Sequence, residues 1–320
     1  MDTPILFLIF NRPDTTQRVF ESIRAIKPKR LFVAADGPRP NKETDKKLCQ
    51  ETRDIIKNID WECEVKTLFR EKNLGCKIAV SSAISWYFEN VNEGIILEDD
   101  CLPNKSFFDF CEIMLEKYRD NEKIGMITGD NFVPNEILNT IDPDAQRYYF
   151  ERPVYLWGWA SWKRAWVKYD LEMKGWPQAQ KTDFLYSIFK NRNVSMFYNS
   201  LFQMTYDGRA TTWDPQWFLS ILSNNMFCIM PPRNLVTNIG IVGEHSNKAG
   251  SFNGMSTQSI SVKDLIHPKI IAPDTEIENR MFHNTGVSTF NLRLYMIQVL
   301  DILGLHTVVS KIYKKLKLKF

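Results

Sequence analysis

The first 131 residues alternate between short apolar runs and amphipathic stretches, and this alternation constrains the fold more than any other feature. The apolar runs at residues 4–10 and 94–97 are typical of buried strands, and residues 30–35 and 64–69 are also predicted to be strands. The stretches between them carry apolar residues three and four positions apart, which predicts helices. Repeated strand–helix units of this length indicate a parallel sheet with helices on both faces. We therefore expect an α/β, Rossmann-like fold with a mixed, mostly parallel sheet.

Three acids, Glu98, Asp99 and Asp100, follow the fourth apolar run. In α/β sheets the carboxyl ends of the strands are where ligands bind. Carboxylate oxygens suit Mg²⁺ or Mn²⁺, which in turn hold phosphates. The alternative is that acids at a strand end are simply solvated.

The second run ends in Asp36, whose carboxylate could accept hydrogen bonds from a ribose or a base. Its alternative role is turn chemistry, because Asp-Gly-Pro favours a turn in any protein. The first strand is not followed by Gly-x-Gly-x-x-Gly, and the chain has no Walker-type phosphate loop. A phosphate-bearing ligand would therefore rely on a metal at the acidic triplet.

Composition limits the class of protein. With 320 residues, 44% hydrophobic and 25% charged, the chain is long enough for one large domain with a helical appendage. Its six Cys show no ligand spacing, which favours buried thiols in a reducing compartment. Without a signal peptide or an apolar segment of about 20 residues, we expect a cytoplasmic protein.

The basic excess is a property of the C-terminal end. Residues 302–320 hold five Lys and no acid, more than the net charge of +3 of the whole chain. This argues against a nucleic-acid-binding surface elsewhere. Residues 311–320 are suited to peripheral contact with an anionic membrane, such as the inner face of the plasma membrane. The alternative is a solvated terminal helix.

Four segments resemble successive motifs of GT-A-fold glycosyltransferases in order and spacing over residues 4–131. They are PILFLIFNRP at 4–13, ADG at 35–37, REKNLG at 70–75 and LEDD at 97–100. The match is to the inverting branch that includes glycosyltransferase family 2 and the N-acetylglucosaminyltransferase I type. The resemblance implies a nucleoside-diphosphate sugar as donor, with uridine diphosphate favoured, and Mn²⁺ or Mg²⁺ as cofactor.

The resemblance also implies roles for residues. Asp36 would face the nucleoside, Arg70 would lie near the base or diphosphate, and Asp100 would bind the metal. The donor-binding candidates are Asn11, Arg12, Asp36, Arg70, Gly75, Lys77, Glu98 and Asp99. Surface ion pairing is the alternative for Arg70, and solvation is the alternative for Lys77.

The second half resembles the family less closely. The segment WGWASW at 157–162 is similar to the Gly-Trp segment that opens the acceptor side, where Gly permits close approach and Trp stacks on sugars. Core packing is the alternative for each Trp. The acceptor-binding candidates are Asp130, Trp157, Gly158, Trp159, Trp213 and Trp217.

The segment WDPQW at 213–217 resembles the element that carries the catalytic base. Inversion needs a carboxylate that takes the proton of the attacking hydroxyl, and we assign this role to Asp214, with Asp130 as the second candidate. Asp before Pro is also a good helix N-cap. His245, in a Gly-rich loop, resembles the family's His near metal and diphosphate, and is otherwise a loop residue.

These observations predict three regions: a nucleotide-sugar-binding half at 1–131, an acceptor-binding and catalytic half of the same domain at 132–250, and a flexible loop with a Lys-rich helical extension at 251–320. The predicted function is metal-dependent, inverting transfer of a hexosyl or N-acetylhexosaminyl group. The acceptor would be a hydroxyl of a glycan or lipid-linked molecule in cell-envelope polysaccharide synthesis. The alternatives are a sugar-phosphate nucleotidyltransferase and a non-catalytic glycan- or nucleotide-binding protein.

Overall fold

The computed structural model describes residues 1–240 and 256–289 of the chain. The chain divides into two compact units, Met1–Leu171 with Thr211–Met281 and Glu172–Ala210 with Phe282–Phe320. The predicted boundary at residue 131, between two halves of one domain, lies within the first unit. The division places residues 172–210, expected within the main domain, in the second unit.

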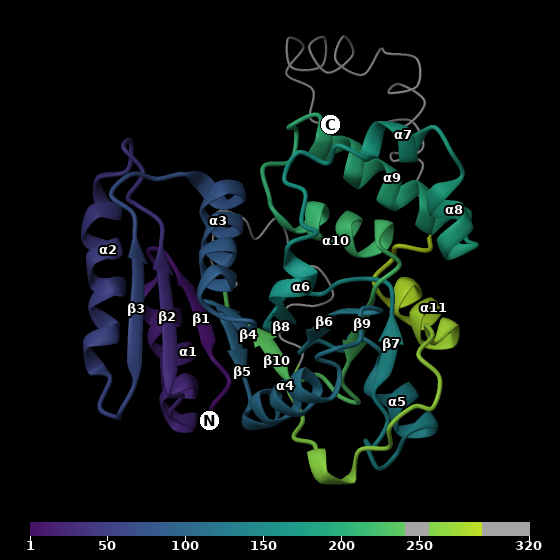
Figure 1. The fold of residues 1–320 in the computed structure, drawn as a ribbon, viewed down its shortest axis with the longest axis horizontal. Helices are drawn as coiled ribbons and strands as arrows, with labels where there is room; N and C mark the ends of the chain where they lie inside the picture. The colour runs from purple at the N-terminus through teal and green to yellow at the C-terminus, as the bar shows by residue number, and fades with distance from the viewer. Residues whose placement is uncertain (241–255, 290–320) are drawn as a thin grey trace. The chain divides into compact units, whose positions relative to one another are not determined.

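The first unit is built on an eight-stranded sheet in the order β3-β2-β1-β4-β8-β6-β9-β7 (Figure 1). Its strands are β1 (Ile5–Ile9), β2 (Arg30–Ala35), β3 (Glu64–Phe69), β4 (Glu93–Glu98), β6 (Ile124–Thr128), β7 (Tyr149–Glu151), β8 (Trp159–Trp162) and β9 (Phe227–Met230). The strands β3, β2, β1 and β4 are parallel, as are β6 and β9, whereas β8 and β7 run antiparallel to their neighbours. The predicted α/β fold with a mixed, mostly parallel sheet is confirmed.

Helices cover both faces of this sheet. They are α1 (Pro13–Ile26), α2 (Glu43–Asp54), α3 (Gly75–Asn90), α4 (Lys105–Lys117), α5 (Asn135–Ile141), α6 (Lys163–Trp166), α10 (Asp214–Ser223) and α11 (Thr275–Asn284), with 3-10 turns at Ile55–Asn58 and Val262–Asp264. Successive residues of β1 point to opposite faces: Phe7 packs in the cluster that includes α1 and α4, and Leu6 in the cluster that includes α3 and α10. Because both faces are covered, every residue of β1 is buried, which explains its unbroken apolar run.

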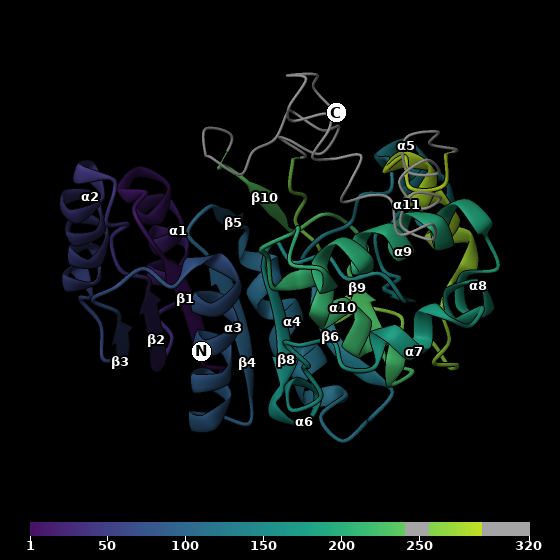
Figure 2. The same cartoon turned by 90° about the horizontal axis from the view of Figure 1, so that it is seen from above.

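The strand order reverses next to β1, which lies between β2 and β4 (Figures 1 and 2). The chain runs outward from β1 through β2 to β3 and then returns to place β4 on the other side of β1. Such a reversal in strand order separates the loops that follow the two strands, and ligands of open α/β sheets bind there. The loop after β1 carries residues 10–12 and the turn after β4 carries residues 98–100.

A second, two-stranded sheet continues from this point. The strand β5 (Cys101–Pro103) pairs antiparallel with β10 (Val236–Asn238). This pairing brings a segment more than 130 residues away in sequence beside the acidic triplet, with Cys101 opposite Asn238.

The prediction of a flexible loop that starts at residue 251 is partly wrong. Residues 256–274 contain little regular structure, but hydrogen bonds tie them to the first unit. Gln258 N donates to Asn234 O at 2.9 Å, and Ile260 N donates to Ser106 Oγ at 3.1 Å. Backbone groups that are paired in this way anchor an irregular segment as well as a strand would.

The second unit contains α7 (Trp176–Gln180), α8 (Phe184–Phe189) and α9 (Arg192–Tyr206). Within it, Trp176 packs edge-on against Phe202, and Phe189 packs against Tyr198. None of the helices in the described part of the chain is long and apolar enough to cross a bilayer. The Lys-rich segment 311–320 and His245 lie outside the described residues.

Gly94, at the start of β4, offers a test of this packing. A Cβ there would lie 1.8 Å from Tyr87 Oη and 2.7 Å from Pro4 O, so Gly94→Ala overpacks the sheet. We expect the free energy of unfolding to fall by about 1–3 kcal/mol in chemical denaturation.

The double variant Gly94→Ala, Tyr87→Phe separates the two causes. Tyr87→Phe removes the hydroxyl that donates to Pro4 O at 2.7 Å, and alone should cost about 1 kcal/mol. Since it also removes the nearest clashing atom, the double variant should lose less than the sum of the single losses. Strict additivity would show that the hydroxyl does not exclude the Cβ.

Candidate active site

Arg12 links the loop after β1 to the turn after β4. Arg12 follows β1 and donates from Nη1 to Asp100 Oδ2 at 2.8 Å and from Nη2 to Asp99 Oδ1. Asp99 Oδ2 also accepts from Phe10 N at 3.0 Å. Both acids follow β4, so the ion pairs connect the carboxyl ends of two neighbouring parallel strands.

Burial sets the charge of this cluster. It raises the pKa of Asp99 to about 6, although Arg12 opposes the shift. It also raises the pKa of Glu98 to about 8, with Asp100 and Asp99 adding to the effect. Burial and the two neighbouring acids thus favour the protonated form of Glu98, whereas Arg12 favours the ionised form of Asp99. A buried carboxylate can remain charged only with such a partner.

The two aspartates also fit a metal ion in their chemistry, because they already surround a cation, the Arg12 guanidinium. Within the described residues, no group of three or more His, Cys, Asp or Glu side chains could hold a metal. Mg²⁺ sites often use only one or two carboxylates, with substrate phosphates and water completing the shell. Asp100 with Asp99 suits a site of that kind.

Asp36 has a structural task that the sequence does not reveal. Its carboxylate accepts from Asn73 Nδ2 at 2.9 Å, Leu74 N at 3.0 Å and Gly75 N at 3.1 Å, and also from the N–H of Gly37. These bonds hold the loop at the start of α3 to the end of β2. Because so many donors already occupy this carboxylate, the expected contact with a nucleoside does not fit it in this structure.

The other donor-binding candidates are spread over the same edge. Asn11 donates to Asp45 Oδ1 at 2.9 Å, and hydrogen bonds from Arg39 lower the pKa of Asp45 to about 2. Arg70 donates to Ser82 Oγ at 2.7 Å. The alternative predicted for Arg70 was a surface salt bridge. Lys77 lies in the first turn of α3, and its side chain is half-buried.

Asp214 lies within electrostatic reach of the acidic triplet. It contributes to the raised pKa of Glu98, and with Glu98 it adds to the effect of burial that raises the pKa of Cys76 to about 12. Burial raises the pKa of Asp214 itself, and Thr212 Oγ1 donates to its carboxylate. The helix-cap alternative is wrong, because Trp213 holds the N-cap position of α10 and Asp214 is its first residue.

Three of the tryptophans expected at the acceptor are core residues. Trp159, Trp213 and Trp217 are at most 3% exposed. The Trp159 ring stacks on that of Trp213 with centroids 5.8 Å apart and lies 6.1 Å from that of Trp217. Their faces are covered by protein, so the role expected for them in stacking on a sugar does not fit, and the alternative of core packing does.

The remaining acceptor candidates surround the end of β6. Trp157 is half-buried, packs edge-on against Phe132, and donates its N–H to Asp130 Oδ2 at 3.0 Å. Gly158 has a φ of +88°, a conformation that favours glycine. Asp130 is fully buried, its Oδ1 has no partner, and burial raises its pKa to about 8. A carboxyl that is protonated at neutral pH and closed to solvent is poorly suited to be the second candidate base.

Sequence reasoning missed the contribution of β10. Ile239 N donates to Asp100 O at 2.7 Å, and a Cβ at Gly240 would lie 2.3 Å from Asp100 Oδ2 and 2.8 Å from Arg12 Nη1. The backbone of Gly240 therefore packs directly on the ion pair. The glycines at 240 and 243 were the available signal, whereas nothing in the sequence indicates Thr212 or Cys76 as neighbours of the site.

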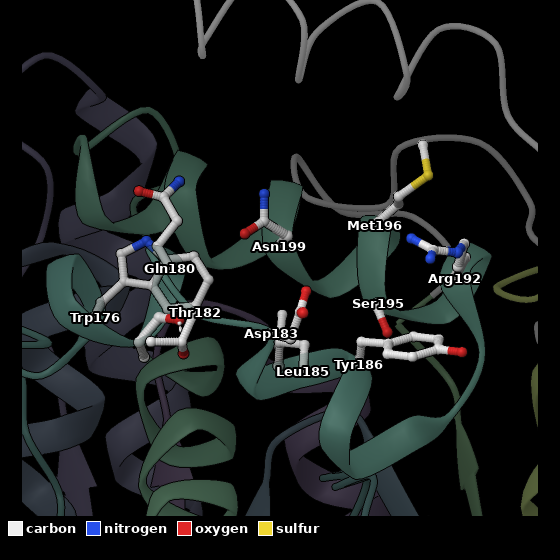
Figure 3. Close-up of a pocket in the computed structure, with 11 residues that line it drawn as sticks. Trp176, Gln180, Thr182, Asp183, Leu185, Tyr186, Arg192, Ser195, Met196 and Asn199 are labelled. Atoms are coloured by element: carbon white, nitrogen blue, oxygen red, sulfur yellow. Dashed lines mark hydrogen bonds between the residues drawn. The ribbon is translucent and has the colours of Figure 1, made fainter.

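The second unit has a hollow of about 200 Å³ formed by residues of α7, α8 and α9 and the segment between α7 and α8. Figure 3 shows Trp176 and Gln180 at one end, Tyr186 and Arg192 at the other, and Asp183 between them. The Arg192 guanidinium lies 5.0 Å from the centre of the Tyr186 ring, which is 37% exposed. An exposed ring among polar side chains suits a small polar ligand.

Comparisons with known proteins give only distant likenesses. No protein-family model matches the chain, and no curated protein matches it. Similar solved structures include HddC from Yersinia pseudotuberculosis, 12% identical over 39% of this chain and 56% of that one, with a TM-score of 0.27. Mouse xyloside xylosyltransferase 1 in its apo form is 10% identical over 52% of this chain and 68% of that one, with a TM-score of 0.28. The chain thus spans little more than half the length of HddC, and these likenesses carry no argument about activity.

The buried Asp130 predicts a pH dependence of stability. Its pKa is raised in the folded state, so the folded protein keeps a proton that the unfolded chain releases above pH 4. The stability contributed by this group is complete at low pH and declines as the pH rises towards 8. Relative to Asp130→Asn, the free energy of unfolding of the wild type should fall by about 2 kcal/mol between pH 5 and pH 7 in denaturant titrations. Parallel curves for the two proteins would contradict this.

Proposed function

We propose that this protein is an inverting glycosyltransferase that moves a sugar from a nucleoside-diphosphate donor to a hydroxyl of its acceptor. The observation that carries the proposal is the pairing of Arg12 with Asp99 and Asp100 at the carboxyl ends of β1 and β4, with Asp214 within electrostatic reach of Glu98. Arg12 suits a phosphate ligand, Asp99 and Asp100 suit a cation, and Asp214 suits the role of the base. The resemblance of residues 4–131 to GT-A motifs supports the same activity.

The donor diphosphate would lie beside Asp100. Asp100 and Asp99 would hold a divalent cation, which when bound neutralises the departing nucleoside diphosphate. Glu98, the last residue of β4, would accept a hydrogen bond from a ribose or sugar hydroxyl of the donor. Uridine diphosphate is the nucleotide that the sequence resemblance favours.

Asp214 would act as the general base. It takes the proton of the acceptor hydroxyl while that oxygen bonds to the anomeric carbon and the bond to the diphosphate breaks on the opposite face. Burial raises the pKa of this carboxylate, which makes it a stronger base than an exposed aspartate. Thr212, which donates to the carboxylate, fixes its orientation.

The acceptor in this proposal is a glycan or a lipid-linked molecule of the cell envelope. Two features of the sequence support this: the Lys-rich end at 311–320, which is suited to an anionic membrane surface, and Trp157, whose ring is only half-buried.

A donor panel tests the activity. The protein is incubated with uridine- and guanosine-diphosphate sugars with and without Mn²⁺, and thermal stabilisation and released products are measured together. Slow release of a nucleoside diphosphate supports the proposal. Formation of pyrophosphate from a nucleoside triphosphate and a sugar phosphate would instead identify a nucleotidyltransferase, and the absence of any nucleotide binding would favour a non-catalytic role.

Asp214→Asn separates binding from chemistry. We expect the Kd for the nucleotide sugar to stay within about threefold of the wild-type value, while kcat falls by about 10²–10⁴-fold, the usual contribution of a general base. The wild-type rate should rise with pH as Asp214 loses its proton, and the variant should lack that dependence.

Asp60→Asn is the matched control, because Asp60 is an exposed carboxylate paired with Arg24 on α1. Its kinetics should equal those of the wild type. Wild-type turnover in Asp214→Asn would place the base elsewhere.

A further inference from the structure

Arg12 occupies both carboxylates on which a metal would bind. The Arg12 side chain is 32% exposed, whereas those of Asp99 and Asp100 are 3% and 13% exposed. The guanidinium therefore covers the two acids from the solvent side. Asp100 Oδ2 accepts from Arg12 Nη1, and Asp100 Oδ1 accepts from Cys101 Sγ at 3.4 Å.

The residues around the Arg12 guanidinium leave little room for a metal ion beside it. The backbone of Gly240 packs against both Asp100 Oδ2 and Arg12 Nη1, closely enough to exclude even a Cβ. A divalent cation on Asp100 would also be repelled by the guanidinium 2.8 Å from the same oxygen. A divalent metal and the Arg12 guanidinium therefore compete for the same carboxylate oxygens.

The guanidinium needs another anion if it leaves. It cannot lose its proton, because an arginine guanidinium stays charged at any pH at which a protein is folded. Arg forms paired hydrogen bonds with phosphate as readily as with carboxylate. A diphosphate bound at the end of β4 would supply that anion and would bring ligands for the metal at the same time.

We propose that Arg12 is a resident counter-ion, which a divalent metal replaces on Asp99 and Asp100 only when a nucleoside diphosphate takes over the guanidinium. This inference rests on the proposed function. Its consequence is a reciprocal coupling: nucleotide tightens metal binding, and metal tightens nucleotide binding by the same factor. Arg12 thus keeps the site closed to free metal.

The test measures Mn²⁺ binding by electron paramagnetic resonance, with and without uridine diphosphate, in the wild type and Arg12→Gln. For the wild type we expect weak binding of Mn²⁺ alone and at least tenfold tighter binding with the nucleotide. For Arg12→Gln we expect Mn²⁺ alone to bind at least tenfold more tightly than to the wild type, because the two carboxylates lack their cation. The effect of the nucleotide should shrink accordingly.

Three further variants identify the cause. Arg12→Lys keeps the charge but not the two paired hydrogen bonds, so its affinity for Mn²⁺ alone should lie between those of the wild type and Arg12→Gln. Arg24→Gln removes an ion pair from the same helix, that with Asp60, and should change nothing. Arg12→Gln combined with Asp100→Asn should lose the gain in Mn²⁺ affinity. Circular dichroism of each variant checks that it is folded.

The outcomes are distinct. If Arg12→Gln binds Mn²⁺ no more tightly than the wild type, Arg12 is not a counter-ion that metal replaces, and the inference is overturned while the proposed function stands. If neither protein binds a nucleoside diphosphate in the presence of Mn²⁺, the proposed function fails, and the coupling part of the inference fails with it.

Discussion

A charge pair across a strand reversal is the interaction on which the candidate site depends. Asp99 is buried at the end of β4, where an unpaired carboxylate would take up a proton, and Arg12 at the end of β1 keeps it ionised. The pair also fixes the distance between two loops that the sheet topology would otherwise leave separate. Charge, strand order and the position of the site are therefore linked, because neither loop alone contains both ions.

The sequence predicts the first half of the fold well. The strands β1, β2 and β4 lie within long apolar runs, and a fully covered parallel sheet requires such runs. By contrast, β8 was not predicted. Its residues WASW read as an aromatic cluster, and it becomes a strand only because β4 and β6 lie on either side to pair with it. Partners so distant in sequence leave no local pattern.

The prediction of the site has the same limit. The residue types and positions of Arg12, Asp100 and Asp214 came from motifs. The structure pairs Arg12 with Asp100 and leaves Asp214 within electrostatic reach of Glu98. Their partners could not be predicted, because a hydrogen bond between residues 88 positions apart is not visible in a local pattern. Asp36 and Trp159 show the opposite error. Both residue types suit a ligand, but in the structure Asp36 accepts hydrogen bonds from the protein and Trp159 stacks on another tryptophan.

The pairing of β5 with β10 connects the charge state of the site to the backbone. Asp100 O accepts the N–H of Ile239, and the next residue, Gly240, rests on the Asp100 carboxylate. A ligand that shifts Asp100 would therefore act directly on the backbone of residues 239 and 240. Ligand binding at Asp100 would then displace residues 239 and 240, which lie more than 100 residues downstream in the chain.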